Sequence, residues 1–226
     1  MIFADRSDAG RRLGRRLESF AQRPNVVVLG VPRGGVTVAG EVALALHAPL
    51  DLLLVRKLGV PGNSELAFGA VSAWGSRYLD DEMVRAAELD AKTVERLIAE
   101  ARQELSRRAV AYRAGRPPLV VTGQTVIVVD DGIATGATAF AAIQALRPLQ
   151  PARVVLAVPV APPATWAWLR TVVDEFVCLE LPDPFPSVGA FYRDFTQVED
   201  AEVIKLLRRA GRALALEAGP GRGRAG

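Results

Sequence analysis

Hydrophobic runs alternate with helical patterns along most of this chain. Short runs of β-favouring apolar residues predict buried strands at 25–31, 50–55, 125–129, 153–158 and 175–179. Segments of helical pattern accompany them at 8–21, 35–47, 136–147, 163–171 and 200–216. Strands that alternate with helices are typical of a parallel sheet whose two faces are both covered. The pattern therefore predicts an α/β fold with a mainly parallel, doubly wound sheet flanked by helices.

The middle of the chain departs from this alternation. Residues 67–73 and 76–79 predict two short strands that turn at Trp74-Gly75. A long helical region follows at 81–113. We therefore expect a single domain over 1–218, with a helical insertion at about 80–115 and a small C-terminal hood. Residues 219–226 are rich in Gly and Arg, which predicts a disordered tail.

Composition narrows the class of protein. A chain of 226 residues with 50% hydrophobic content can bury one sizeable core. The formal net charge of +3 is too small for a molecule covered by nucleic-acid-binding charge. The single cysteine, Cys178, excludes an internal disulfide and fits a reducing cytosol. No signal peptide and no membrane span is predicted, so we expect a soluble cytoplasmic protein.

The stretch from Val126 to Thr138 carries the strongest chemical signal. Four aliphatic residues are followed by Asp130 and Asp131, and then by a loop of Gly, Thr and Ala. Ligands of open α/β sheets bind beyond the carboxyl ends of the strands. The loop can turn several N–H groups towards an anion, and the helix expected near Gly136 adds its positive end. The carboxylates can accept hydrogen bonds from sugar hydroxyls, and the backbone amides beside them can bind a phosphate. Together they predict a ribose 5-phosphate site.

Other interpretations of this stretch fit less well. A Walker A loop needs Gly-Lys-Ser/Thr, and a dinucleotide fingerprint needs G-x-G-x-x-G, and neither is present here. The acidic pair of response-regulator receivers normally follows the first strand and has no phosphate loop after it. A plain turn with a helix cap would leave the Thr-Gly-Ala-Thr run unexplained.

The stretch resembles the signature of type I phosphoribosyltransferases for 5-phosphoribosyl 1-diphosphate (PRPP). The resemblance implies that Asp130 and Asp131 contact the ribose 2- and 3-hydroxyls. It assigns the 5-phosphate to the loop Gly132, Ile133, Ala134, Thr135, Gly136, Ala137 and Thr138, where Gly132 is a mild departure. It also implies Mg²⁺, bound mostly by the ribose hydroxyls and the diphosphate. Direct protein ligands are not expected, although Asp130 and Asp131 could touch the metal through water.

A second loop, Val31 to Val36, follows the first predicted strand. Its Gly34 and Gly35 let the backbone approach an anion, and Arg33 supplies a planar set of donors. Taken alone, Arg-Gly-Gly is a common turn. In the family that this chain resembles, the corresponding loop holds pyrophosphate, often through a cis peptide. The resemblance therefore assigns pyrophosphate to Arg33, Gly34 and Gly35.

Two further cations, Arg56 and Lys57, stand at the end of the second predicted strand. Such cations can neutralise pyrophosphate, and the Gly/Pro/Asn/Ser-rich segment 59–65 has the makeup of a mobile lid. The family has a flexible loop here that closes over PRPP. The alternative is a solvated surface turn.

The resemblance extends to a branch of bacterial predicted phosphoribosyltransferases with a long helical insertion. The segments that resemble it are 3–11, 56–70 and 191–195, and the likeness covers most of 3–208. It does not indicate the substrates. Phe191 and Tyr192 could stack on an acceptor base, although aromatic residues more often simply pack. His47 is interpreted as structural.

The leading hypothesis is transfer of ribose 5-phosphate from PRPP to an unidentified nitrogen acceptor, with release of pyrophosphate. Asp130, Asp131, Arg33 and Lys57 are the expected catalytic residues. An alternative is a PRPP- or nucleotide-sensing regulator of the same fold without catalysis. Its basic face would consist of arginines in the helical region, Arg96, Arg102, Arg107, Arg108 and Arg113, although glutamates interleave with them. Nucleic acid is thus not the expected partner, and a homodimer through the insertion stays open.

Overall fold

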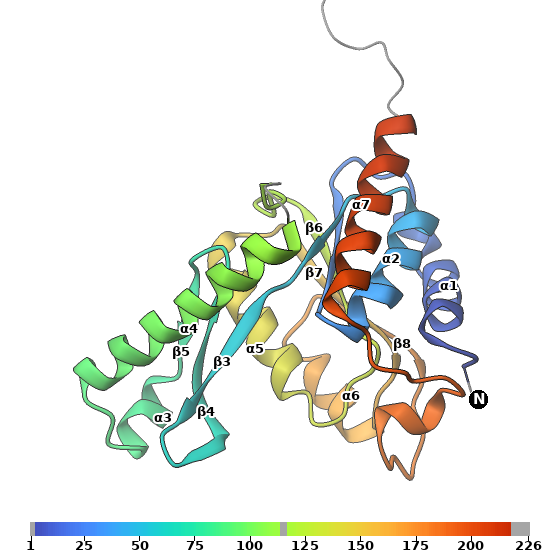
Figure 1. Ribbon diagram of the computed structural model, residues 1–226. Coiled ribbons are helices and arrows are strands. Elements are labelled where there is room, and N and C mark those ends of the chain that lie inside the picture. Colours follow the sequence, from blue (N-terminus) through green and yellow to red (C-terminus); the bar gives the residue numbers. More distant parts are fainter. Residues whose placement is uncertain (1–2, 114–116, 218–226) are drawn as a thin grey trace, which may run out of the picture.

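The computed structural model describes residues 3–113 and 117–217, and a parallel sheet forms its central layer (Figure 1). Five strands of the described residues make this sheet, in the order β2-β1-β6-β7-β8. Their bounds are β1 (Val26–Gly30), β2 (Leu50–Leu52), β6 (Thr125–Val129), β7 (Arg153–Val160) and β8 (Glu175–Glu180). Every neighbouring pair runs parallel. The predicted fold class is therefore confirmed.

Helices cover both faces of this sheet. They are α1 (Arg6–Arg16), α2 (Gly34–Leu46), α5 (Ala137–Leu146), α6 (Pro163–Leu169) and α7 (Asp200–Glu217). Ile127 and Val129 of β6 pack into the core beneath α1, α2 and α7. Val126 and Val128 point the other way, into the core beneath α5 and α6. All of β6 is therefore buried, which explains why the core strands read as uninterrupted hydrophobic runs.

Short helical turns extend three of the connections. They are η1 (Glu18–Phe20), η2 (Arg147–Leu149) and η3 (Val188–Phe191). No helix within 3–113 and 117–217 has the length and apolar character needed to cross a bilayer. The predicted tail at 219–226 lies outside the described residues.

Residues 55–113 form an arm that extends to one side of the core (Figure 1). It contains the antiparallel strands β3 (Val55–Val60), β4 (Asn63–Ser72) and β5 (Arg77–Leu79), followed by α3 (Asp81–Ala86) and α4 (Ala91–Arg113). The turn between β4 and β5 falls at Trp74-Gly75, as predicted. The helical region is interrupted before α4, where Asp90 Oδ1 accepts a hydrogen bond from Thr93 N (2.6 Å).

The predicted end of the second core strand was wrong. The second core strand ends at Leu52 instead of residue 55, and Arg56 and Lys57 lie inside β3. They pair with Val71 and Ala70 of β4, so they belong to a hairpin and not to the end of a core strand. Residues 59–65, predicted as a lid, form the tip of this hairpin and the strand ends beside it. The apolar run continues from β2 into β3, which hid the break.

A buried ion pair joins the arm to the core. Arg113 at the end of α4 donates from Nε to Asp51 Oδ1 of β2 (3.1 Å), and both side chains are 7% exposed. Asp51 Oδ2 also accepts a hydrogen bond from Leu119 N (3.0 Å). The guanidinium lies 5.3 Å from the ring of Trp74. The base of the arm is thus fixed by charge and packing together.

The hood comprises residues 181–199, between β8 and α7. Its centre is an aromatic cluster that joins the hood to the N-terminal segment, made of Phe3, Phe185, Phe191, Tyr192 and Phe195. Phe3 N donates to Phe191 O (2.7 Å), and the rings of Phe3 and Tyr192 lie 5.3 Å apart. The small C-terminal hood predicted from the sequence is therefore present, and it lies against the start of the chain.

Candidate functional site

Two loops meet at the carboxyl ends of β1 and β6. Gly30 and Val129, the last residues of these strands, are register partners, so the loops that follow begin side by side. Together with Val188 of the hood they surround a hollow of about 350 Å³, called here the strand-end hollow. Its lining consists of Val31, Pro32, Arg33, Gly34, Asp130, Asp131, Gly132, Ile133, Ala134, Thr135, Gly136, Thr138, Ala139 and Val188.

Glycine is required where the two loops touch. A Cβ atom on Gly34 would strike the carboxylate of Asp131, and one on Gly35 would lie 2.7 Å from Asp130 Oδ1. The peptide bond between Pro32 and Arg33 is cis. The predicted pyrophosphate loop is therefore packed directly against the predicted ribose carboxylates.

Two helices begin at the rim of this hollow. α2 starts at Gly34 and α5 starts at Ala137, each directly after one of the two loops. Gly136 precedes α5 with a φ of 81°, a left-handed conformation that glycine adopts at no steric cost. Helix N-termini carry partial positive charge and unpaired N–H groups. The hollow therefore combines carboxylates with two sites that favour anions.

The two aspartates have unequal surroundings. Asp130 Oδ1 accepts a hydrogen bond from Asp131 N (2.8 Å), while Asp131 Oδ2 pairs with Arg6 Nε (2.7 Å). Exclusion of water raises the pKa of Asp130 well above its ordinary value, and the neighbouring Asp131 carboxylate raises it further. Exclusion of water also raises the pKa of Asp131, but the hydrogen bond and charge of Arg6 oppose this shift.

Arg6 is a site residue that sequence reasoning missed. It is only 9% exposed, donates from Nη1 to Thr196 O (2.8 Å) and lies 3.8 Å from the ring centre of Phe195. Asp5 caps α1 and so places Arg6 in its first turn. A cation at a helix N-terminus is unfavourable on electrostatic grounds. An arginine in the first turn of a predicted helix could therefore have indicated that it pairs with an acidic residue elsewhere in the chain.

The hood contributes Val188 to the lining of the hollow, and its Tyr192 contacts Asp131. The Tyr192 hydroxyl donates to the backbone carbonyl of Asp131, and burial followed by the charge of Asp131 raises its pKa. Its ring packs 5.0 Å from that of Phe195, and Phe191 packs 5.1 Å from Phe185. These contacts favour the packing interpretation of the two aromatic residues over stacking on a base.

The structure does not bring all the predicted cations together. Arg56 and Lys57 line a separate hollow of about 180 Å³ between β3 and α4, beside Glu100. Arg33 lines the strand-end hollow, but its Nη1 lies 3.9 Å from Asp200 Oδ1 of α7. Contact of these three side chains with pyrophosphate therefore stays a prediction.

Comparison with known proteins places this geometry in a family. The sequence profile of the phosphoribosyl transferase domain matches residues 7–190. Relatives from two strains of Mycobacterium tuberculosis, whose names give phosphoribosyl transferase as a presumed activity, are 51% identical over 218 residues. The alignment covers 96% of this chain but 49% of those proteins, so the chain spans about half their length. The crystal structure of TT1426 from Thermus thermophilus is 44% identical, with a TM-score of 0.84 over 92% of this chain and 99% of that one. This chain belongs to the phosphoribosyl transferase domain family.

Proposed function

We propose that this chain transfers ribose 5-phosphate from PRPP to a nitrogen acceptor and releases pyrophosphate. The observation that carries the proposal is the strand-end hollow, where Asp130 and Asp131 lie beside the N-termini of α2 and α5. Carboxylates accept hydrogen bonds from vicinal hydroxyls, and the two helix ends favour the phosphates at either end of the donor. Membership of the phosphoribosyl transferase domain family supports the same reaction class.

In this reaction the bond from the anomeric carbon to the diphosphate oxygen breaks, and its electron pair leaves with pyrophosphate. The acceptor nitrogen forms the new bond to that carbon and gives up a proton. The transition state has oxocarbenium character, as in other glycosyl transfers. Asp130 and Asp131 would fix the sugar through its hydroxyls. The loop from Arg33 to Gly35 would bind the leaving group and stabilise its developing charge.

Mg²⁺ is the proposed cofactor, and the donor set fits an ion carried mostly by the substrate. The described residues contain no cluster of three or more His, Cys, Asp or Glu side chains that could hold a metal ion. Asp130 and Asp131 each use one oxygen in hydrogen bonds to the protein, so each has a second oxygen for a sugar hydroxyl or a metal-bound water. When bound, the ion would neutralise charge on the diphosphate.

Lys57 and Arg56 can take part in the proposed reaction only if the β3–β4 hairpin moves. Both lie on β3, outside the strand-end hollow. Their predicted contact with pyrophosphate requires the hairpin tip at 59–65 to close over the donor, which would also exclude water from the anomeric carbon.

The basic face proposed for a nucleic-acid-binding regulator is largely neutralised by the chain itself. Arg96 pairs with Glu100 at 2.6 Å, and Arg107 pairs with Glu104 at 3.1 Å. Arg113 is buried against Asp51. These contacts favour a solvated, self-paired helix α4 over a nucleic-acid surface.

A pyrophosphate-release assay with PRPP, Mg²⁺ and a panel of purine, pyrimidine and amine acceptors tests the reaction. PRPP titration by calorimetry should accompany it, because binding without release for any acceptor would instead indicate a sensor. The matched variants are Asp131→Asn and Asp81→Asn, of which Asp81 is exposed on α3. We expect PRPP affinity to fall more than tenfold in the first, since a charge-assisted hydrogen bond is lost, and to stay unchanged in the second. Equal affinities would count against the site.

A further inference from the structure

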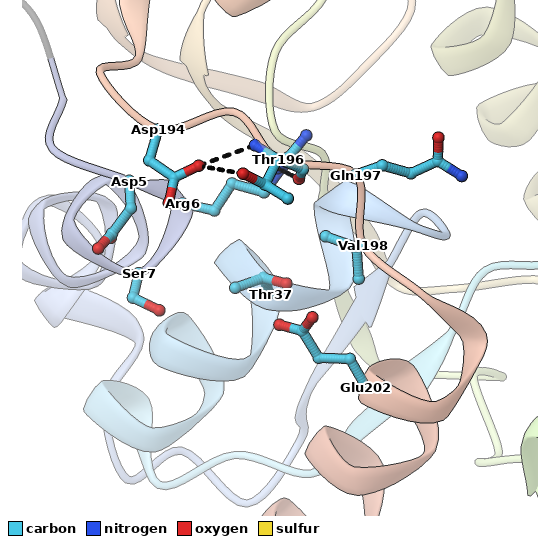
Figure 2. A pocket seen from close by; sticks show the side chains of 9 residues that line it. All are labelled: Asp5, Arg6, Ser7, Thr37, Asp194, Thr196, Gln197, Val198 and Glu202. Atoms are coloured by element: carbon cyan, nitrogen blue, oxygen red, sulfur yellow. Dashed lines mark hydrogen bonds between the residues drawn. The ribbon is translucent and has the colours of Figure 1, made fainter.

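A second hollow lies where α1, α2 and α7 begin. Its volume is about 250 Å³, and the hood residues 194–198 close one side of it (Figure 2). It is lined by Asp5, Arg6, Ser7, Thr37, Asp194, Thr196, Gln197, Val198 and Glu202. None of these residues lines the strand-end hollow. The salt bridge between Arg6 and Asp131 joins the two hollows.

The second hollow is acidic. Asp5, Asp194 and Glu202 contribute three carboxylates to its lining, against the single guanidinium of Arg6. That guanidinium is already engaged by Asp131 and by Thr196 O. Asp194 Oδ1 accepts from Thr196 N (2.9 Å) and Oγ1 (2.6 Å), as Figure 2 shows, which leaves its second oxygen for another donor. The lining therefore carries more negative charge, and more hydrogen-bond acceptors, than the guanidinium of Arg6 neutralises.

Thr37 provides an independent observation. Its side chain is buried, with 8% exposure, and its Oγ1 has no hydrogen-bond partner within the part of the chain that the structure describes. Figure 2 shows this hydroxyl on the side of the residue that faces Val198 and Glu202. A buried hydroxyl without a partner is unfavourable, and native proteins rarely leave one unmatched. A ligand in the hollow would supply the missing partner.

We propose that the second hollow binds a small organic cation with several N–H donors, such as an aliphatic amine or a guanidine. Its N–H groups would donate charge-assisted hydrogen bonds to Glu202 and Asp194, and a further polar group would reach Thr37. Asp5 caps α1, and Asp200 and Glu202 lie in the first turn of α7, so carboxylates already offset the positive ends of these two helices. An anion would meet the three carboxylates of the lining. The volume lies below the range of sites for drug-sized ligands, so the ligand is small. A ligand in contact with Arg6 would be separated from Asp131 only by the Arg6 side chain.

Calorimetric titration of the full chain with agmatine and with putrescine tests this site, with butanediol as the uncharged comparison. We expect at least one of the two cations to bind saturably at one site per chain, and the diol not to bind. Glu202→Gln should weaken cation binding about tenfold, because one charge-assisted hydrogen bond is lost. Glu199→Gln is the matched control: Glu199 is exposed nearby but is not part of the lining, so affinity should not change.

Thr37→Val separates binding from folding. It keeps the shape of the side chain and removes the unmatched hydroxyl, so the melting temperature should stay constant or rise while cation binding weakens several-fold. Absence of saturable binding by both amines would overturn the proposal. Equal affinity in wild type and Glu202→Gln, or equal losses in Glu202→Gln and Glu199→Gln, would overturn it as well. The readout is binding without PRPP, so either result leaves the proposed transfer reaction untouched.

Discussion

At the scale of single residues, the acidic pair shows how much position matters. Asp130 and Asp131 are adjacent in sequence, but Arg6 pairs only with Asp131. The pKa of Asp130 is raised by exclusion of water and then by the second carboxylate. A raised carboxyl pKa means that the charged form is disfavoured in the folded protein. The negative charge at Asp130 therefore costs stability at neutral pH, and we interpret that cost as accepted for ligand binding.

Asp130→Asn should consequently be as stable as the wild type or more stable at neutral pH, while PRPP binding is lost. The sign follows from linkage: the protonated carboxyl is favoured in the folded state, so its advantage is present below about pH 4 and lost as the pH rises through the raised pKa. Urea unfolding of both proteins at about pH 4 and about pH 7 checks this. A variant that is less stable than wild type at neutral pH would contradict it.

Arg6→Met should have the opposite effect on stability. The change removes the partner of Asp131 and the hydrogen bond to Thr196 O, and it leaves a carboxylate without its cation. We expect a loss of about 3 kcal/mol in the free energy of unfolding. Arg6→Lys keeps the charge and should recover part of that loss. Urea denaturation measures both, and a Met variant as stable as wild type would show that the ion pair does not contribute.

At the scale of elements, sequence reasoning succeeded where one strand is buried on both faces. The boundaries of β6 agree with the prediction because its four apolar residues alternate between two cores and a polar residue ends the run. The break between β2 and β3 was missed because apolar residues continue through it. Nothing local distinguishes a core strand from an arm strand when the pairing partner lies later in the chain. Which strands pair depends on the tertiary structure, and the spacing of apolar residues does not reveal it.

A double-mutant cycle can measure the interaction between Arg113 of α4 and Asp51 of β2. Arg113→Met leaves Asp51 buried without its cation, and Asp51→Asn leaves a buried guanidinium, so each should cost about 3 kcal/mol of stability. The double variant removes both charges and should lose less than the sum of the two. Additive losses in chemical denaturation would show that the two side chains do not interact.

At the scale of the whole molecule, the first turn of α1 and the hood meet at Asp131, beside the two loops of the strand-end hollow. Sequence reasoning placed both loops there, because each follows a core strand and carries its own glycines. It missed Arg6 altogether and did not foresee that Tyr192 contacts Asp131, and these two contacts span 125 and 61 residues of the sequence. Such contacts leave no periodic signal, and only the packing of α1 and the hood on the sheet creates them.

Tyr192→Phe tests whether the hood supports the site. It removes one hydrogen bond to the Asp131 carbonyl and keeps the ring in its aromatic cluster. We expect a loss of about 1 kcal/mol in stability and a weaker affinity for PRPP. Phe185→Leu is the comparison, because it alters the same cluster without touching Asp131. If both variants bind PRPP as tightly as the wild type, the hood does not position Asp131.

The register between Gly30 and Val129 has a consequence for the spacing of the two loops that follow these residues. Adjacent strands of a sheet are held about 4.8 Å apart by their backbone hydrogen bonds. That interval sets how far apart the proposed diphosphate loop and the proposed sugar-binding carboxylates leave the sheet, before any side chain is considered. Substitutions within the loops can change how tightly the proposed donor is held, but the spacing of the two strand ends stays set by the sheet.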